Sequence, residues 1–209
     1  MIVIINYGMG NLRSVEKAVE LCGGSPVVSN KVEDLKKADK IVLPGVGAFG
    51  EGMKNLGELS LLETLREEVL IKKKPFLGIC LGMQLVAKKS YEFGEHEGLG
   101  WLDAEVKKFP SNMGLKVPHV GWDDILIKKE TPLFNKTSLR DPSFYFVHSY
   151  YMENNNPEDV VATCIYGIEF TAAINKENIF ATQFHPEKSQ NNGLSLLKEF
   201  IAWQPKMIC

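Results

Sequence analysis

The first half of the chain alternates short apolar runs with segments of helical periodicity, and this alternation is the feature that most constrains the fold. Helical spacing of apolar residues is found over residues 12–22, 59–70 and 81–89. An alternation of this kind predicts a parallel sheet with crossover helices. The expected strands are Ile2–Ile5, Pro26–Ser29 and residues 40–43 and 75–79.

The second half changes character, because β-like runs follow one another directly. They lie at residues 101–109, 122–127, 144–152, 160–165, 170–174 and 179–184. Turn signals separate them, so we expect hairpins that extend the parallel sheet. A final helix is expected over residues 194–203. With no repeat, linker or low-complexity segment, residues 1–209 are predicted to form one domain.

Charge and cysteine usage exclude several classes of function. Lys and Arg total 24 against 26 acidic residues, a formal net charge of -2, so no basic footprint for nucleic acid or an anionic membrane is expected. The N-terminus has no cationic segment before its short apolar run, and no stretch has transmembrane length. Four scattered cysteines without a C-x-x-C pair predict neither a zinc site nor a disulfide framework. A cytoplasmic location is the simplest interpretation.

The most informative motif is Gly78-Ile79-Cys80-Leu81-Gly82, which joins an expected strand to an expected helix. Its G-x-C-x-G spacing is typical of a nucleophile elbow, a strained turn that projects the central side chain. A helix N-terminus favours a thiolate at Cys80, and the Leu81 amide could face a developing oxyanion. The alternative is a buried structural cysteine, and this segment alone does not decide between the two.

A second motif, His185-Pro186-Glu187, follows another expected strand. Pro186 disfavours a helical conformation at His185, so the segment should be extended, with the side chains of His185 and Glu187 on one side. A carboxylate that orients an imidazole is the arrangement required of a general base. The alternative is an ordinary surface pair. The carboxyl ends of parallel strands share one crevice, so Cys80 and His185 are expected to meet there.

Together these motifs resemble the class I glutamine amidotransferases. Four further segments resemble those of the glutaminase subunits of imidazole glycerol phosphate synthase. The resemblance implies a flavodoxin-like α/β three-layer sandwich, with a mostly parallel central sheet and an antiparallel β extension in the second half. The further segments are Asn6-Tyr7-Gly8-Met9-Gly10-Asn11-Leu12, Pro44-Gly45-Val46-Gly47-Ala48-Phe49, Pro118-His119-Val120-Gly121-Trp122 and Gln183-Phe184-His185-Pro186-Glu187-Lys188-Ser189.

The resemblance implies that Cys80 attacks the side-chain amide of glutamine, which gives ammonia and a thioester that water then hydrolyses. His185 would move the protons and Glu187 would orient His185. Backbone amides of Leu81 and Val46 would hold the oxyanion, although an ordinary βα turn also explains residues 44–47. No cofactor and no metal are implied.

The remaining site residues are likewise assigned through the resemblance. Gly47, Gln84, Glu92 and Ser149 would bind glutamine, and a solvated helix-end carboxylate is the alternative for Glu92. His119 and His148 are interpreted as structural histidines.

The resemblance also implies a heterodimer with a (β/α)8-barrel cyclase subunit that receives the ammonia. Asn11, Trp122 and Lys188 would contact this partner. Two residues depart from the usual pattern, Asn6 in place of Asp and Asp123 in place of Asn.

Three other functions compete with this hypothesis. A paralogous glutaminase could feed another synthase, such as a sugar amidotransferase. A non-catalytic binding module could retain the fold, although an intact Cys80, His185 and Glu187 disfavour it. A nucleotide-binding protein is disfavoured because Gly8-Met9-Gly10 lacks the third glycine of a dinucleotide fingerprint.

Overall fold

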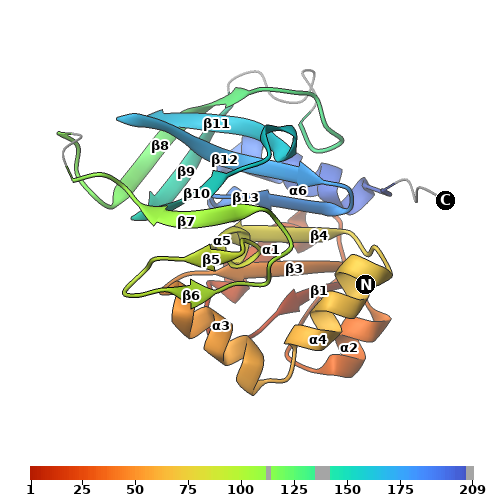
Figure 1. Cartoon of the computed structure of the whole chain (residues 1–209). Helices are drawn as coiled ribbons and strands as arrows, with labels where there is room; N and C mark the ends of the chain where they lie inside the picture. The colour runs from red at the N-terminus through yellow and green to blue at the C-terminus, as the bar shows by residue number, and fades with distance from the viewer. Residues whose placement is uncertain (112–113, 135–141, 206–209) are drawn as a thin grey trace.

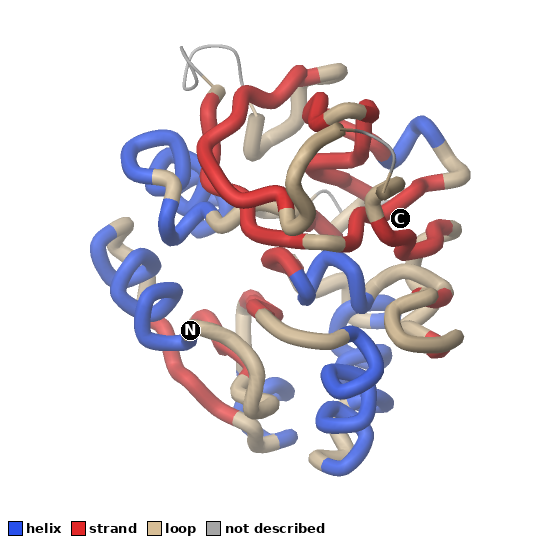
Figure 2. Tube along the Cα trace, turned by 90° about the vertical axis from the view of Figure 1, so that its left-hand side faces the viewer, coloured by secondary structure: helices blue, strands red, loops and turns tan. Residues whose placement is uncertain are grey.

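The computed structural model describes residues 1–111, 114–134 and 142–205, which form a large central sheet with helices on both faces. Figure 1 shows the strands between two helical layers, and Figure 2, turned by 90°, shows helices on both flanks of the strands. This confirms the predicted α/β three-layer class. The helices are α1 (Leu12–Leu21), α2 (Val32–Lys37), α3 (Phe49–Glu58), α4 (Leu62–Leu65), α5 (Leu81–Leu85) and α6 (Gln190–Ala202).

The central sheet has nine strands in the order β2-β1-β3-β4-β13-β12-β11-β8-β9. The strands from β2 to β13 in this order run parallel, and the remaining strands pair antiparallel. The predicted antiparallel extension of a parallel sheet is therefore present. The strands are β1 (Ile2–Ile5), β2 (Pro26–Ser29), β3 (Lys40–Gly45), β4 (Phe76–Cys80), β8 (His119–Ile127), β9 (Ser143–His148), β11 (Val160–Tyr166), β12 (Ile168–Lys176) and β13 (Ile179–Thr182).

Strand β1 shows why the sheet needs helices on both faces. All four of its residues are buried, and alternate side chains enter two different cores. Ile2 and Ile4 pack in the core that includes α1 and α6, whereas Val3 and Ile5 pack in the core that includes α2, α3 and α4. The layers thus follow from the uninterrupted apolar runs in the sequence.

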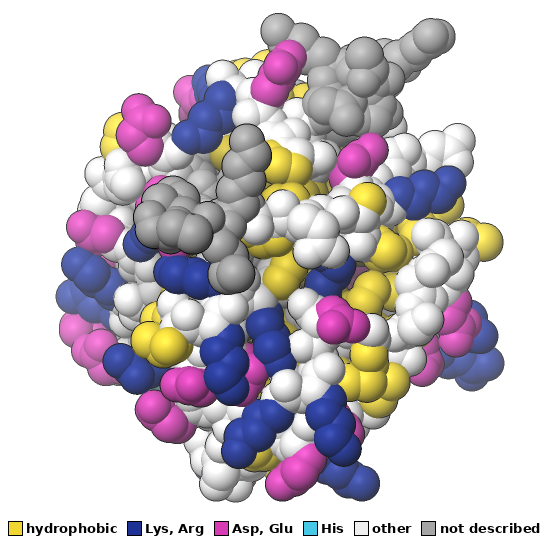
Figure 3. Space-filling view, turned by 90° about the vertical axis from the view of Figure 1, so that its right-hand side faces the viewer, with side chains coloured by type: hydrophobic (Ala, Val, Ile, Leu, Met, Phe, Trp, Pro, Cys, Tyr) yellow, Lys and Arg dark blue, Asp and Glu magenta, His cyan; other side chains and the backbone are white. Residues whose placement is uncertain are grey.

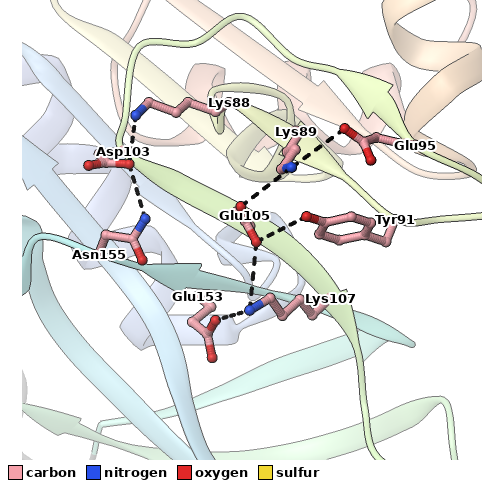
Figure 4. Close-up of polar contacts among 9 residues, drawn as sticks. All are labelled: Lys88, Lys89, Tyr91, Glu95, Asp103, Glu105, Lys107, Glu153 and Asn155. Carbon is pink, nitrogen blue, oxygen red and sulfur yellow. Dashed lines mark hydrogen bonds and ion pairs between the residues drawn. The ribbon is translucent and has the colours of Figure 1, made fainter.

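A second, four-stranded sheet in the order β10-β7-β5-β6 lies beside the first. One of its faces carries pairs of opposite charge, drawn in Figure 4, with Glu105 between Lys89 and Lys107. Hairpins joined to the parallel sheet were expected here, so this separate sheet corrects the prediction. Its strands are β5 (Lys89–Ser90), β6 (His96–Glu97), β7 (Ala104–Lys108) and β10 (Tyr150–Asn154).

The expected run over residues 144–152 is in fact two strands that belong to different sheets. Strand β9 lies in the central sheet and β10 in the small one, and the chain changes sheets at Ser149. The carbonyl of Ser149 accepts a hydrogen bond from the Phe109 amide, 3.1 Å away, which ties the crossing to the small sheet. This change of sheet leaves Ser149 beside the site described below.

Three expected helices differ from the structure by more than one residue at an end, and the last of them, expected over 194–203, begins earlier, at Gln190. The helix expected over 59–70 begins later, because Ser60 has φ 56° and its turn separates α3 from α4; the helix then continues as the π-helical segment Arg66–Ile71. The helix expected over 81–89 ends at Leu85, whose carbonyl accepts a hydrogen bond from the Leu99 amide, 2.8 Å away. Loop residues therefore take the place of a further helical turn.

Charge of both signs is interspersed on the surface, as the near balance in the sequence predicts. Figure 3 shows lysine and arginine side chains beside acidic ones on one face of the molecule. Among the described residues, no helix is both long enough and apolar enough to span a bilayer.

Candidate active site

Cys80 lies at a strained turn between β4 and α5. Its backbone has φ 54° and ψ -106°, a region that residues other than glycine rarely adopt. A Cβ atom on Gly78 would lie 2.8 Å from the Gly82 carbonyl oxygen, and one on Gly82 would lie 1.8 Å from the Leu43 oxygen. Both glycines of the G-x-C-x-G motif are therefore required by close backbone packing, as expected for a nucleophile elbow.

His185 and Glu187 lie beside this turn and contact each other. His185 Nδ1 lies 2.8 Å from Glu187 Oε1, and both side chains are only 2% exposed. His185 is extended, as Pro186 predicts, but Glu187 lies in the 3-10 segment Pro186–Lys188. The two side chains therefore meet across a tight turn and not, as expected, along an extended segment.

The environment of His185 favours its charged form. Burial alone would lower the pKa of His185, but its interactions with Cys80 and Glu187 raise the pKa to about 10. The opposite imidazole nitrogen, Nε2, is buried without a hydrogen-bond partner of normal geometry. The arrangement therefore favours a charged imidazole beside the sulfur of Cys80.

A cavity of about 440 Å³ opens onto Cys80. It brings together the expected nucleophile, both residues expected to supply oxyanion amides and all four residues expected to bind the substrate. His185 and Glu187 are not part of its wall. The cavity is lined by Val46, Gly47, Ala48, Cys80, Leu81, Gln84, Glu92, Phe93, Pro118, Val147, His148, Ser149 and Tyr150.

Glu92 lies between β5 and β6, not at a helix end, and it is 9% exposed. Its Oε2 accepts a hydrogen bond of 2.6 Å from the Phe49 amide at the start of α3, where the helix dipole favours a negative charge. Burial raises the pKa of Glu92, and this hydrogen bond opposes the shift. A buried carboxylate in the cavity wall is suited to an ammonium group of a ligand.

Gln84 is held firmly in the wall of the cavity. Its Nε2 donates to the Tyr150 carbonyl at 2.9 Å and to Gln183 Oε1 at 3.0 Å. Both amide hydrogens therefore have partners inside the protein. The side-chain oxygen of Gln84 is therefore the atom that could accept a hydrogen bond from a ligand.

Gln183 begins the segment that contains His185 and Glu187, but the sequence analysis predicts no role for it. It is fully buried, and its Nε2 lies 3.7 Å from Cys80 Sγ. The signal that could have identified it is a polar residue directly after the apolar strand β13. Tyr7 also received no role from the sequence. Its buried hydroxyl has no hydrogen-bond partner, and a Cβ atom on Gly45 would lie only 2.2 Å from it.

Two of the three expected partner-contact residues lie around one aromatic ring. The rings of Trp122 and Tyr145 meet edge to face, 6.2 Å apart, and Lys188 Nζ lies 5.7 Å from the Tyr145 ring. Trp122 is 46% exposed. Asn11 is exposed in a different loop, where its side chain caps α1 by accepting from the Ser14 amide at 3.4 Å. Tyr145 was not identified from the sequence.

The described residues include no group of three or more His, Cys, Asp and Glu side chains placed to hold a metal ion. Their cysteines, Cys22, Cys80 and Cys164, are all free, and Cys209 lies outside the described residues.

Comparison with known proteins identifies the family. A family model described as "Glutamine amidotransferase class-I" matches residues 3–203. The chain belongs to the class I glutamine amidotransferase family.

Close relatives carry more specific names. The chain is 52% identical to "Imidazole glycerol phosphate synthase subunit HisH 1" of Campylobacter jejuni (strain RM1221), over 96% of this chain and 99% of the relative. It is 50% identical to "Imidazole glycerol phosphate synthase subunit HisH" of Aquifex aeolicus (strain VF5), over 95% and 94%.

Solved structures share the fold. One titled "Crystal structure of glutamine amidotransferase" matches with a TM-score of 0.71 and 19% identity, over 96% of this chain and 99% of the other. "Structure of PurLQS from Thermotoga maritima" matches with a TM-score of 0.72 and 18% identity, over 96% and 97%. At these identities the likeness extends to the fold alone.

Proposed function

We propose that this chain is the glutaminase subunit of an imidazole glycerol phosphate synthase, with Cys80, His185 and Glu187 as its catalytic residues. The main support for the proposal is that Cys80, which has a strained backbone, lines a cavity, with a buried imidazole and carboxylate beside it. Names of relatives at 50% and 52% identity support the particular enzyme. The whole chain, residues 1–209, would act as one glutaminase domain in the cytoplasm, where free thiols persist.

The first step forms a thioester. The Cys80 thiolate attacks the side-chain amide carbon of glutamine, and the negative charge moves to the carbonyl oxygen. Backbone amides of Leu81 and Val46 would donate to this oxyanion. As the C–N bond breaks, the proton on His185 passes to the leaving nitrogen, which departs as ammonia.

The second step releases glutamate. Neutral His185 takes a proton from water, and the resulting hydroxide adds to the thioester carbonyl. The C–S bond then breaks, and Cys80 leaves as a thiolate beside the protonated imidazole. Glu187 accepts the hydrogen bond from Nδ1–H of His185 throughout. No step needs an oxidant, a reductant or a metal.

Substrate contacts come from residues that line the cavity. Glu92 would bind the ammonium group of glutamine, because it is a buried carboxylate already directed toward the cavity. Gly47 and Ser149 would contact the carboxylate end through backbone amides, and Gln84 would face the side chain. All four residues lie in the cavity wall.

The ammonia would pass to a cyclase partner with a (β/α)8-barrel fold. Ammonia in water at neutral pH is mostly the ammonium ion, which is not a nucleophile, so an enclosed passage between subunits would preserve the reactive form. The surface around Trp122, Tyr145 and Lys188, with Asn11, would contact this partner. An exposed tryptophan packed against a tyrosine is typical of protein interfaces, where aromatic residues are enriched.

A steady-state assay of glutamate release tests the proposal. The glutaminase rate should be low for the subunit alone and should rise at least tenfold with the cyclase partner and its nucleotide ligand present. A rate that does not respond to the partner would contradict the assignment.

A genetic test separates the histidine-pathway enzyme from a paralogue that feeds another synthase. Expression of this chain should restore growth of a histidine-requiring strain that lacks its own glutaminase subunit but retains a compatible cyclase. The Cys80→Ala variant is the matched control and should not restore growth. Failure of the active chain to do so would favour the paralogue.

A further inference from the structure

An unbroken chain of buried hydrogen bonds begins at the surface of strand β8. Asp123 Oδ2 lies 2.6 Å from His119 Nε2, and the side chains are 40% and 1% exposed. Gly121 lies between these two residues of the strand and leaves no side chain in the way. His119 Nδ1 lies 3.1 Å from Nε2 of His148, which is directly opposite on β9. His148 Nδ1 in turn lies 2.8 Å from the Tyr150 carbonyl oxygen.

The chain continues from Tyr150 to the sulfur of Cys80. The Tyr150 carbonyl also accepts a hydrogen bond from Gln84, Gln84 donates to Gln183, and Gln183 contacts Cys80 Sγ. His148, Tyr150, Gln84 and Cys80 all line the cavity. A half-exposed carboxylate is thus linked to the nucleophile through the wall of the cavity.

A count of hydrogens shows what the outer part of this chain requires. Three contacts join the Asp123 carboxylate, the two imidazoles and the Tyr150 carbonyl, and both ends only accept hydrogen bonds. Each contact therefore needs a hydrogen on an imidazole nitrogen, but two neutral imidazoles carry only two. The three bonds are complete only when the pair holds one additional proton, which faces the Asp123 carboxylate.

Of the two imidazoles, His119 is the one that can take this proton, because only it contacts a carboxylate. Burial lowers the pKa of His148 to about 3 even though its hydrogen bond to the Tyr150 carbonyl opposes the shift, and His119 and His185 lower it further, so His148 stays neutral. Burial also lowers the pKa of His119, and Asp123 opposes that shift. The proton on His119 therefore depends on the Asp123 carboxylate.

Three other titratable residues lie near the two histidines: Tyr166 and Cys164 on strand β11, and Asp124 on strand β8. Tyr166 stacks on the His119 ring at 4.0 Å and donates its hydroxyl to the Lys116 carbonyl. Burial raises the pKa of Cys164 to about 12, so its thiol is neutral. The adjacent Asp124 is exposed. Asp123 is the carboxylate that hydrogen-bonds to the pair.

We propose that Asp123 is a positioning residue for the glutaminase reaction, acting through His119 and His148 to fix the wall of the cavity beside Cys80. This inference rests on the proposed function. In a neutral pair, one of the three contacts lacks a hydrogen, and the series of hydrogen bonds from Asp123 to the Tyr150 carbonyl is no longer complete.

Two substitutions in the complex with the cyclase partner test the proposal. Asp123→Ala leaves His119 Nε2 without a partner, and kcat should fall by roughly tenfold or more, with little change in KM. Asp123→Asn restores much of that rate, because an amide N–H can donate to a neutral His119. The matched control is Asp124→Ala, which removes a neighbouring exposed carboxylate and should behave as wild type.

The pH dependence provides a readout that a purely structural role would not change. The wild-type kcat profile should contain an ionisation between about pH 5 and 8 that is absent from Asp123→Asn. Nitrogen-15 spectra of the histidine rings should show His119 doubly protonated at low pH in the wild type, and one neutral tautomer in Asp123→Asn. Identical profiles, or a His119 ring that does not titrate in the wild type, would overturn the proposal. The spectra need no turnover, so they separate this failure from an absence of glutaminase activity.

Discussion

The edge of the central sheet at Cys80 and the charged face of the small sheet differ in whether their polar groups are buried and whether they have partners. Beside Cys80, a strained backbone accompanies buried polar atoms without hydrogen-bond partners: the Tyr7 hydroxyl, His185 Nε2 and Glu187 Oε2. On the small sheet, drawn in Figure 4, partly exposed side chains such as Lys88 and Asp103 pair at 2.8 Å. Strain and unpaired groups cost stability, and beside Cys80 we interpret them as preparation for chemistry, whereas exposed ion pairs contribute little to stability.

Substitution at the nucleophile should give the largest difference between the two regions. Cys80→Ala removes the attacking sulfur, and the partner-stimulated glutaminase rate should fall by on the order of 10⁴-fold or more. The measurement is glutamate release in the complex. Cys22→Ser is the control, because Cys22 lies outside the cavity, and its rate should match wild type. Substantial turnover by Cys80→Ala would remove the basis of the comparison.

Substitution of the carboxylate beside His185 should give the next largest effect. Glu187→Gln removes a charge that raises the pKa of His185 and that orients the ring, so kcat should fall by roughly 10² to 10⁴-fold. A decrease smaller than tenfold would show that Glu187 is not needed to orient the imidazole.

The same variant should change how stability depends on pH. The pKa of His185 is about 10 in the folded protein, above the usual 6.5, so its contribution is complete below pH 6.5 and is lost as the pH rises toward 10. Without the Glu187 charge, this loss should begin at a lower pH. Melting curves of wild type and Glu187→Gln between pH 6 and 10 measure it; curves that stay parallel would contradict the assignment.

Disrupting the close packing at Gly82, beside Cys80, should have an intermediate effect, which we expect in the stability of the fold. A Cβ at Gly82 would lie 1.8 Å from the Leu43 carbonyl oxygen, so Gly82→Ala should destabilise the fold by about 3 kcal/mol. Gly57→Ala is the matched control, because Gly57 lies in helix α3 and its nearest atom would be 3.7 Å away. Thermal unfolding should show a clear decrease for the first variant and none for the second.

The sequence predicted those elements of the fold whose residues form a clear local pattern, and it missed elements whose pattern is set by tertiary contacts. Short runs of β-forming residues predicted β1 and β2 with their exact bounds; β1 is apolar throughout because it is buried on both faces, whereas β2 lies at the edge of the sheet. Helix α3 was missed because Gly50, Gly52 and Gly57 weaken its pattern. Those glycines have tertiary causes: Gly50 lies under the His96 ring and Gly52 against Leu85.

The candidate site was predicted in the same uneven way. Cys80 and His185 lie in motifs whose spacing has a local mechanical reason, and the structure brings them together. Gln183 and Tyr145 were missed, because their positions depend on contacts between strands far apart in the chain. Similarly, His119 and His148 were taken as structural histidines, and only the pairing of β8 with β9 reveals their link to the cavity.

The charged face should give the smallest effect. Glu105→Gln removes one carboxylate from the exposed pairs with Lys89 and Lys107, and stability should change by about 0.5 kcal/mol or less. The glutaminase rate should not change. Chemical denaturation in low and high salt measures the effect, and a loss as large as that of Gly82→Ala would show that the two regions do not differ as argued.

The most direct measurement is labelling of the complex with an electrophilic analogue of glutamine, followed by mass spectrometry of the peptides. The account predicts one adduct, on the sulfur of Cys80, with glutamine slowing its formation and His185→Ala nearly abolishing it. Modification of Cys22 or Cys164 instead, or no adduct in a complex that turns over glutamine, would contradict it.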